Sequence, residues 1–323
     1  MISSRRSFVK NIALAGTALP LLHVPFVAKA SDLFQGADGA SFEETLEINI
    51  FSKHLQFLDY KQTGEIAAEL GFDGVDLTVR PKGHVLPETV KEDLPKAING
   101  ISQGGSNCSL ITTSIESVSN PLDVNIIETA AKSGIKYYRT HWFKYIKDRS
   151  MTDSLAIYQD EIKKLGDFNK ENDIIGCYQN HAGTDIGSSF WEIHQILQTV
   201  DKQYFGTEYD IRHATAEGGY SWVNGFELLR EQIKVVVLKD FKWARVDGKW
   251  TTLNVPIGEG MVDFTRFFQL LKKYQINVPV SLHLEYPLGG AEKGNYSITV
   301  DKKIVFESMK KDLDMIRKLW EKA

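Results

Sequence analysis

The sequence predicts an α/β fold: a single (β/α)8 TIM barrel preceded by a cleavable signal peptide. Three observations predict it. Short β-rich runs alternate with helix-periodic segments, which implies crossover connections and a parallel sheet. Several helical segments run into a glycine and then the next strand, as in AELGFDGVDL and AAKSGIKYY, the sequence of a left-handed helix cap. No proline-rich or serine-rich linker divides the chain, and one barrel accommodates its length.

Residues 1–30 are predicted to be a twin-arginine signal peptide. Arg5 and Arg6 precede an apolar run, Ile12 to Leu22, that lacks acidic residues, and Ala28-Lys29-Ala30 supplies a small-x-small cleavage site. The alternative is a buried N-terminal helix. A membrane span needs about 20 apolar residues, and this run has roughly half that number. We therefore expect no stable membrane insertion after cleavage.

This assignment divides the chain into a signal peptide (1–30), an unstructured lead (31–45) and the barrel (46–323). The expected location is periplasmic, or otherwise outside the cytoplasm by the twin-arginine route. Cleavage would leave 34 basic against 42 acidic residues, a formal net charge of about −8. Such a charge repels phosphate backbones, so nucleic acid is not an expected partner and a small neutral substrate fits better.

Eight strands are predicted from runs rich in β-branched and aromatic residues. They cover Leu46 to Phe51, Gly74 to Val79, Ser109 to Ile115, Lys136 to His141, Ile174 to Gln179, Phe205 to Tyr209, Lys234 to Lys239 and Pro279 to Leu284. Helical periodicity marks the segments between and after them: Thr63 to Leu70, Asn125 to Ser133, Leu155 to Asn172, Phe190 to Val200, Phe226 to Gln232, Val262 to Tyr274 and Lys303 to Lys322.

The functional site of such a barrel is expected at the carboxyl ends of its strands. Six of the seven histidines after residue 30 lie at predicted strand ends, and only His194 falls inside a helix. Other polar residues follow the strands too: Ser52, Lys53, Arg80, Lys82, Arg139, Gln179, Asn180, Asp210, Arg212, Lys239, Asp240 and Glu285. This concentration favours a site over a set of solvated loops.

Strand alternation brings several of these groups to one side. Glu208, Asp210 and Arg212 share a face, as do His283 and Glu285. Carboxylates and imidazoles that converge in this way suit a divalent metal (Mn, Mg, Co or Zn) that holds a hydroxy-carbonyl substrate and polarises its carbonyl while a carboxylate removes the neighbouring proton. The product is an enediolate, which leads to isomerisation, epimerisation or elimination.

Each member also has a structural interpretation. In that interpretation Asp210 pairs with neighbours of Arg212, and Glu285 pairs with a lysine. Lys239 forms a surface ion pair with Asp240, and His181 caps the loop Ala182-Gly183-Thr184. Joint placement at strand ends supports the functional interpretation more strongly than any single residue does.

The chain resembles the xylose-isomerase-like barrel superfamily, and looks like an exported bacterial member of it. The resemblance spans residues 46–321 and is carried by GFDGVDLTVRPKGHVLPE, CYQNHAGT, YDIRH, VLKDF, IGEG and LEYP. This superfamily includes sugar and sugar-phosphate isomerases and epimerases, tagatose 3-epimerase and inosose dehydratase.

The resemblance implies a metal shell of Glu, Asp, His and Glu on strands 5 to 8. Asp210 and Glu285 match it, and His213 stands at the family's D-x-x-H offset. Strand 5 offers Cys177, Gln179 or His181 instead of Glu, and Val237 occupies the position of the His. Three possibilities follow in order: His181 or His283 completes a rearranged shell, the Lys239 ammonium replaces the ion, or the barrel binds sugar without catalysis.

We therefore expect a sugar isomerase or epimerase, with a lyase or hydratase second, that acts on a free sugar, a glycoside or a keto-sugar. The expected catalytic residues are Glu285, Lys239 and His213, and the expected metal ligands are His181, Asp210 and Glu285. Substrate hydroxyls are assigned to Arg80, His84, His141 and Arg212, and stacking to Tyr178, Trp142, Trp222 and Trp243. The alternative function is a non-catalytic periplasmic glycan-binding barrel; an abasic-site endonuclease would need more ligands and less negative charge.

Overall fold

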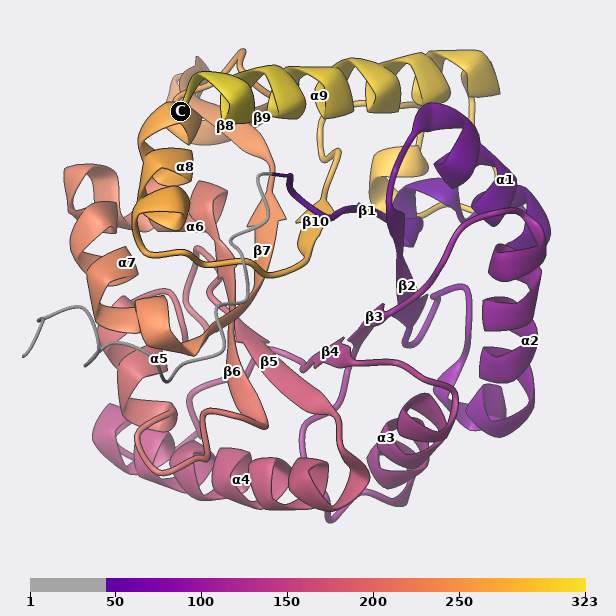
Figure 1. Cartoon of the computed structure of the whole chain (residues 1–323). Helices are drawn as coiled ribbons and strands as arrows, with labels where there is room; N and C mark the ends of the chain where they lie inside the picture. The colour runs from indigo at the N-terminus through magenta and orange to yellow at the C-terminus, as the bar shows by residue number, and fades with distance from the viewer. Residues whose placement is uncertain (1–44) are drawn as a thin grey trace, which may run out of the picture. The chain divides into compact units, whose positions relative to one another are not determined.

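The computed structural model describes residues 45–323; the predicted signal peptide and nearly all of the predicted lead lie outside them. Eight parallel strands close into a barrel in the order β1-β10-β7-β6-β5-β4-β3-β2 (Figure 1). Their bounds are β1 Ile48–Phe51, β2 Gly74–Val79, β3 Leu110–Thr113, β4 Tyr137–Arg139, β5 Ile175–Gln179, β6 Phe205–Asp210, β7 Ile233–Leu238 and β10 Val280–Leu282. The predicted barrel is confirmed, and each observed strand overlaps the predicted one.

Helices surround the strands: α1 Tyr60–Leu70, α2 Val90–Gln103, α3 Pro121–Lys132, α4 Met151–Asn172, α5 Phe190–Ile196, α6 Ile211–Gly218, α7 Trp222–Leu229, α8 Phe264–Lys273 and α9 Lys302–Lys322. The sequence did not predict α2, which contains Pro95, or α6, which follows β6 without a loop. The predicted helix up to Val200 ends at Ile196, and the one predicted over Phe226 to Gln232 starts earlier, at Trp222. In residues 45–323 no helix combines the length and apolar character that a membrane crossing requires.

Helix α1 shows how local sequence sets these boundaries. The Asp59 side chain accepts a hydrogen bond from the Gln62 N–H, and the Gln62 side chain returns to the Asp59 N–H, a capping box. Gly71 ends the helix at φ 89°, where a side chain would be strained. The glycine cap expected before β2 is therefore confirmed.

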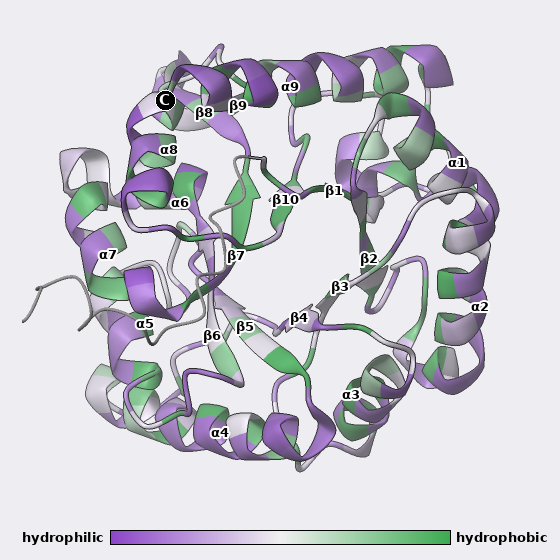
Figure 2. Ribbon diagram, viewed as in Figure 1, coloured by the Kyte–Doolittle hydropathy of each residue, from purple (hydrophilic) through white to green (hydrophobic). Residues whose placement is uncertain are grey.

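The hydrophobic core lies mainly between the strands and the helices, whose outward faces are hydrophilic (Figure 2). Inside the barrel, a separate small apolar cluster consists of Leu110, Cys177 and Val235. Further along the same strands polar residues occupy inward positions, with Thr112, Gln179 and Lys239 towards the carboxyl ends. Polar side chains therefore follow apolar ones along these three strands.

An antiparallel hairpin, β8 Asp240–Val246 and β9 Lys249–Val255, follows β7 directly. The sequence interpretation missed it. Its turn residues Asp247 and Gly248 have φ 48° and 78°, as a type I′ turn requires. The Asp-Gly pair between two alternating segments was the signal that predicts such a hairpin.

Candidate active site

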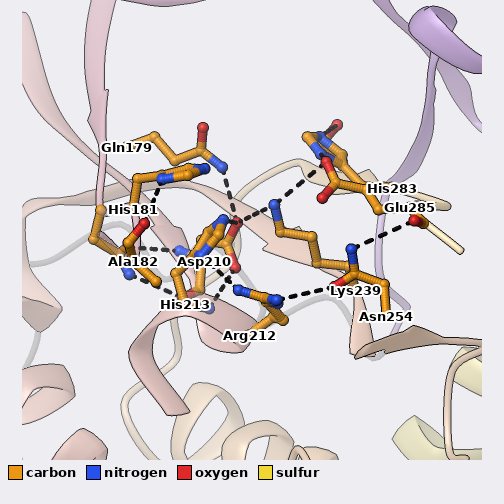
Figure 3. A network of polar contacts seen from close by, with 12 residues as sticks. Gln179, His181, Ala182, Asp210, Arg212, His213, Lys239, Asn254, His283 and Glu285 are labelled. Carbon is orange, nitrogen blue, oxygen red and sulfur yellow. Dashed lines mark hydrogen bonds and ion pairs between the residues drawn. The ribbon is translucent and has the colours of Figure 1, made fainter. Parts of the chain in front are cut away.

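The centre of the site is the Lys239 ammonium. Its Nζ lies 3.1 Å from Asp210 Oδ2 and 3.6 Å from Glu285 Oε1. Figure 3 shows the lysine between Asp210 on one side and His283 with Glu285 on the other. Lys239 is 3% exposed, so this contact is not a surface ion pair. The predicted convergence of Asp210 and Glu285 at one end of the barrel is confirmed, with a lysine between them.

Hydrogen bonds with His213, Gln179 and Asn180 fix the position of Asp210. It is the N-cap of α6: its Oδ1 accepts from the His213 N–H at 3.0 Å. Its Oδ2 accepts from Gln179 Nε2 at 2.8 Å, and the Asn180 side chain bonds both its N–H and its C=O. Burial raises the pKa of the Asp210 carboxyl, and the charge of Lys239 opposes that rise.

Glu285 lies where the strand β10 segment leaves the barrel. Burial by itself would raise its pKa, but the ammoniums of Lys239 and Lys53 outweigh burial and hold the pKa well below its usual range. Lys53 Nζ contacts Oε1 at 3.3 Å, the same oxygen that faces Lys239. Glu285 is therefore a lysine partner, as the structural interpretation expected, and also a carboxylate at the mouth of the barrel.

Two histidines stand on the other side of Lys239. His213 Nδ1 lies 3.0 Å from Arg212 Nη1; a guanidinium only donates, so Nδ1 accepts and Nε2 carries the hydrogen. That Nε2 points towards Asp210 Oδ2 at 3.7 Å. His181 Nδ1 lies 2.9 Å from the Ala182 carbonyl, which leaves a lone pair on Nε2. Burial lowers the pKa of His181 to about 4, so both rings are neutral near pH 7.

Below this layer lies a buried network that the sequence interpretation left unassigned. Arg139 Nη1 donates to Gln179 Oε1 at 3.0 Å. Asp76 accepts from Thr112 and from Ser281 Oγ, at 2.9 and 2.6 Å. Neither carboxylate oxygen of Glu208 has a hydrogen-bond partner among the described residues. Burial, with the charge of Asp76, raises the pKa of Glu208 to about 8. The sequence feature that pointed to Glu208 was its inward position on the strand, two residues before Asp210.

A cavity of about 460 Å³ opens above the ion pairs. Its lining joins residues of the site, His181, Arg212, His213 and Glu285, to the hairpin residues Trp243, Trp250, Thr251 and Thr252. A cavity of this size is in the range of small-molecule sites. Trp243 was expected at the barrel mouth; Trp250 was not singled out.

Other expected contact residues lie elsewhere. Arg80 lines a separate cavity that it shares with Lys53. His84 Nδ1 bonds Ser52 Oγ at 3.1 Å, and His141 Nε2 faces Glu116 at 3.8 Å; neither lines the 460 Å³ cavity.

Two of the four expected stacking residues are structural. Tyr178 is fully buried, and its hydroxyl donates to the Ile186 carbonyl. Trp222 is 6% exposed and packs edge-on against Phe267. Both therefore have apolar or backbone partners in place of a ligand, which corrects the prediction for them. Trp142 lies under Arg139 and against His181.

The residues present do not fit a divalent ion. The space between Asp210 and Glu285 is taken by an ammonium, and the side chain of Val237 offers no donor atom. The Gln179 oxygen is engaged by Arg139, and the Nδ1 of His181 by a carbonyl. In the described part of the chain no group of three or more His, Cys, Asp or Glu residues is arranged to hold a metal.

Residues 65–302 match a protein-family model described as "Xylose isomerase-like TIM barrel". A search of curated protein sequences finds no match.

Solved structures with the same fold share little sequence with the chain. D-psicose 3-epimerase from Clostridium cellulolyticum H10, with D-tagatose, is 12% identical at a TM-score of 0.65, over 85% of this chain and 99% of that one. The 3-keto-D-glucoside 4-epimerase of E. coli is 13% identical at 0.61, over 85% and 100%. A xylose isomerase-like TIM barrel protein from Mycobacterium smegmatis, in complex with magnesium, is 12% identical at 0.61, over 85% and 98%. At these identities the likeness supports the fold alone.

Proposed function

The chain belongs to the xylose isomerase-like TIM barrel family, and from this premise we propose that it is a sugar isomerase, epimerase or lyase that works through an enediolate. The observation that carries the proposal is the buried Lys239 ammonium between Asp210 and Glu285. Similar structures include two sugar epimerases, D-psicose 3-epimerase and 3-keto-D-glucoside 4-epimerase. The outcome of the reaction, a new isomer, a new epimer or an eliminated group, depends on the substrate.

In this scheme Lys239 donates a hydrogen bond to the carbonyl oxygen of the sugar. Glu285 takes the proton from the adjacent carbon: the C–H bond breaks, its electron pair forms the C=C bond of the enediolate, and the charge moves to the oxygen at Lys239. A fixed cation placed where charge develops stabilises the transition state without reorganisation. Return of the proton to the former carbonyl carbon, with a proton shift between the two oxygens, gives an isomer. Delivery of a proton from solvent to the opposite face of the original carbon gives an epimer.

The low pKa of Glu285 limits the substrate. A carboxylate whose pKa lies well below 7 is a weak base, so the proton it removes must already be acidified by an adjacent carbonyl. This favours keto-sugars and their glycosides over closed aldopyranoses. For substrate hydroxyls on the far side of Lys239, His213 Nε2–H and the Arg212 guanidinium are donors and the His181 Nε2 lone pair is an acceptor.

The proposed reaction uses no divalent metal, because the side chains around Lys239 leave no place for one. The metal ligands expected from the sequence, His181, Asp210 and Glu285, act here as a hydrogen-bonding imidazole and the two partners of Lys239. We expect protein treated with EDTA and dialysed to keep its activity. A loss of activity that Mn, Mg, Co or Zn restores would reinstate the metal shell.

The deciding experiment is incubation with free sugars, glycosides and 3-keto derivatives in D₂O, followed by NMR. Deuterium at one carbon identifies the abstracted proton. Glu285→Gln is expected to retain binding and lose exchange, whereas Glu259→Gln, at an exposed ion pair with Lys311, is the matched control. Absence of exchange with every substrate, together with unchanged affinity of the Glu285→Gln variant, would identify a glycan-binding barrel instead.

We also propose that the protein is exported, on the strength of Arg5-Arg6 and the apolar run that follows. Export places the enzyme where phosphorylated sugars are scarce. Replacement of Arg5 and Arg6 by lysine is expected to retain the full-length precursor in the cytoplasm. Unchanged fractionation of that variant would refute the proposal.

A further inference from the structure

One face of the β8–β9 hairpin carries a row of aromatic side chains. Residues that are opposite each other in an antiparallel pair lie on the same face, and every second residue along a strand does too. The register pairs Phe241 with Asn254, Trp243 with Thr252, and Arg245 with Trp250. Phe241, Trp243 and Trp250 therefore follow one another along one face, from the base of the hairpin to its turn.

The exposure of these side chains rises along that row. Phe241 is 1% exposed, Trp243 44% and Trp250 70%. An indole that remains this exposed has given up the stabilisation that burial offers a large apolar side chain. Hydrophobic packing among residues 45–323 thus explains Phe241 and does not explain the two tryptophans.

The hairpin is fixed to the site at its base. The carboxylate of Asp240 accepts four backbone N–H groups, from Phe241, Gly258, Gly260 and Val262, at 2.8 to 3.2 Å. Asp240 thus binds the IGEG loop and is not a surface partner of Lys239. Because a Cβ at Gly260 would lie 2.1 Å from Asp240 Oδ1, this loop needs glycine there.

Arg212 makes the second connection between the hairpin and the site. Its guanidinium lies over the Phe241 ring at 4.7 Å and donates to Asn254 Oδ1 at 3.0 Å, while its Nη1 orients His213. The aromatic face is therefore held in register with the reactive groups.

The tryptophans line the same cavity as the site. Trp243, Trp250, Thr251 and Thr252 share the 460 Å³ cavity with His213 and Glu285. A sugar ring placed against His181, His213 and Glu285 occupies one part of this cavity and leaves the two tryptophans uncovered. Indole rings bind the apolar C–H face of a pyranose, and neighbouring threonine hydroxyls bond its oxygens.

We propose that the Trp243–Trp250 face binds a second ring, so that the natural substrate is a glycoside larger than a monosaccharide. The reacting ring lies against His181, His213 and Glu285, and the sugar or aryl group joined to it stacks on the hairpin. The inference rests on the proposed function for the identity of the reacting ring, but binding of the second ring is measurable without turnover.

The test compares ligands that differ only in the second ring: 3-keto-glucose, methyl 3-keto-glucoside, 3-keto-cellobiose and phenyl 3-keto-glucoside. Dissociation constants come from calorimetry and from tryptophan fluorescence, and kcat/KM from deuterium exchange. The variants are Trp243→Ala and Trp250→Ala. Trp191→Ala is the matched control, because Trp191 is also 70% exposed and lies on α5, outside this cavity.

We expect the two-ring ligands to bind the wild-type protein at least tenfold more tightly than the one-ring ligands. The hairpin variants should remove that difference, with one-ring affinities within twofold and the control unchanged. Equal losses for all ligands, no loss for two-ring ligands, or a change of molecular mass in light scattering that shows a second copy covering the hairpin would each overturn the inference. Deuterium exchange with one-ring ligands only would overturn the inference and leave the proposed function intact. Tighter binding of two-ring ligands without exchange of any ligand would overturn the proposed function and leave the inference intact.

Discussion

Replacement of Lys239 by methionine keeps the length of the side chain and removes the charge that the proposed chemistry uses. The variant leaves Asp210, which is 0% exposed, and Glu285 without the ammonium that lies 3.1 and 3.6 Å from them. At an effective dielectric constant of about 20, each contact is an attraction of about 5 kcal/mol before the desolvation of the ions is counted. Breaking a buried pair by removing one partner typically costs about 3–5 kcal/mol, which we take as the expected loss of stability at pH 7.

The pH dependence of this loss has a definite sign. Burial raises the pKa of Asp210 in the folded protein, with Lys239 opposing the rise, so Lys239→Met should raise it further. An acid with a raised folded pKa contributes stability when protonated, and that contribution is lost as pH increases through the folded pKa. The variant should therefore be closest to wild type in acid and should fall behind it towards neutral pH.

Urea unfolding of wild type, Lys239→Met and Lys239→Met/Asp210→Asn at pH 5 and pH 8, with kcat for exchange at each pH, tests both roles of the lysine. We expect the double variant to recover much of the stability and none of the activity, because it removes the unpaired charge and still lacks the cation. Loss of one preorganised donor typically lowers kcat by about 10²–10³. Activity within threefold of wild type in Lys239→Met would refute the electrophilic role, and undiminished stability would refute the buried ion pairs.

Two further predictions concern residues around the site. Since the pKa of Glu208 is raised to about 8 from 4.5, its protonated form adds stability that is complete below pH 4.5 and is lost as pH rises to 8, on the order of 5 kcal/mol; Glu208→Gln should flatten this part of the pH–stability curve in urea titrations, and an unchanged slope would count against the raised pKa. Gly260→Ala should lower stability by about 1–3 kcal/mol, because its Cβ would overlap the Asp240 carboxylate. Gly218→Ala, whose Cβ would meet Ser221 Oγ at 3.4 Å, is its control in the same thermal melts, and equal melting temperatures for both would refute the overlap.

The sequence by itself determined the barrel, because the features that predict it involve only neighbouring residues. Strand runs such as GVDLTV, a cap such as Gly71 and polar residues just after each strand are readable from a few neighbouring positions. Parallel strands place their carboxyl ends together in any such barrel, so the convergence of Asp210 and Glu285 followed from their positions alone. The hairpin was also readable, from Asp247-Gly248, and was missed because the segment was taken as part of a connection after strand 7.

Only the tertiary structure decided what each charge contacts. Lys239 meets carboxylates 29 residues before it and 46 residues after it in the chain, and its direction into the barrel depends on β7 lying between β6 and β10. No local pattern distinguishes this lysine from one at the surface, because the attraction acts through space and depends on burial by the whole fold. For the same reason two features emerge only when strands distant in sequence are brought together: the Glu208 carboxylate, which has no hydrogen-bond partner within residues 45–323, and the tryptophan-lined wall of the cavity.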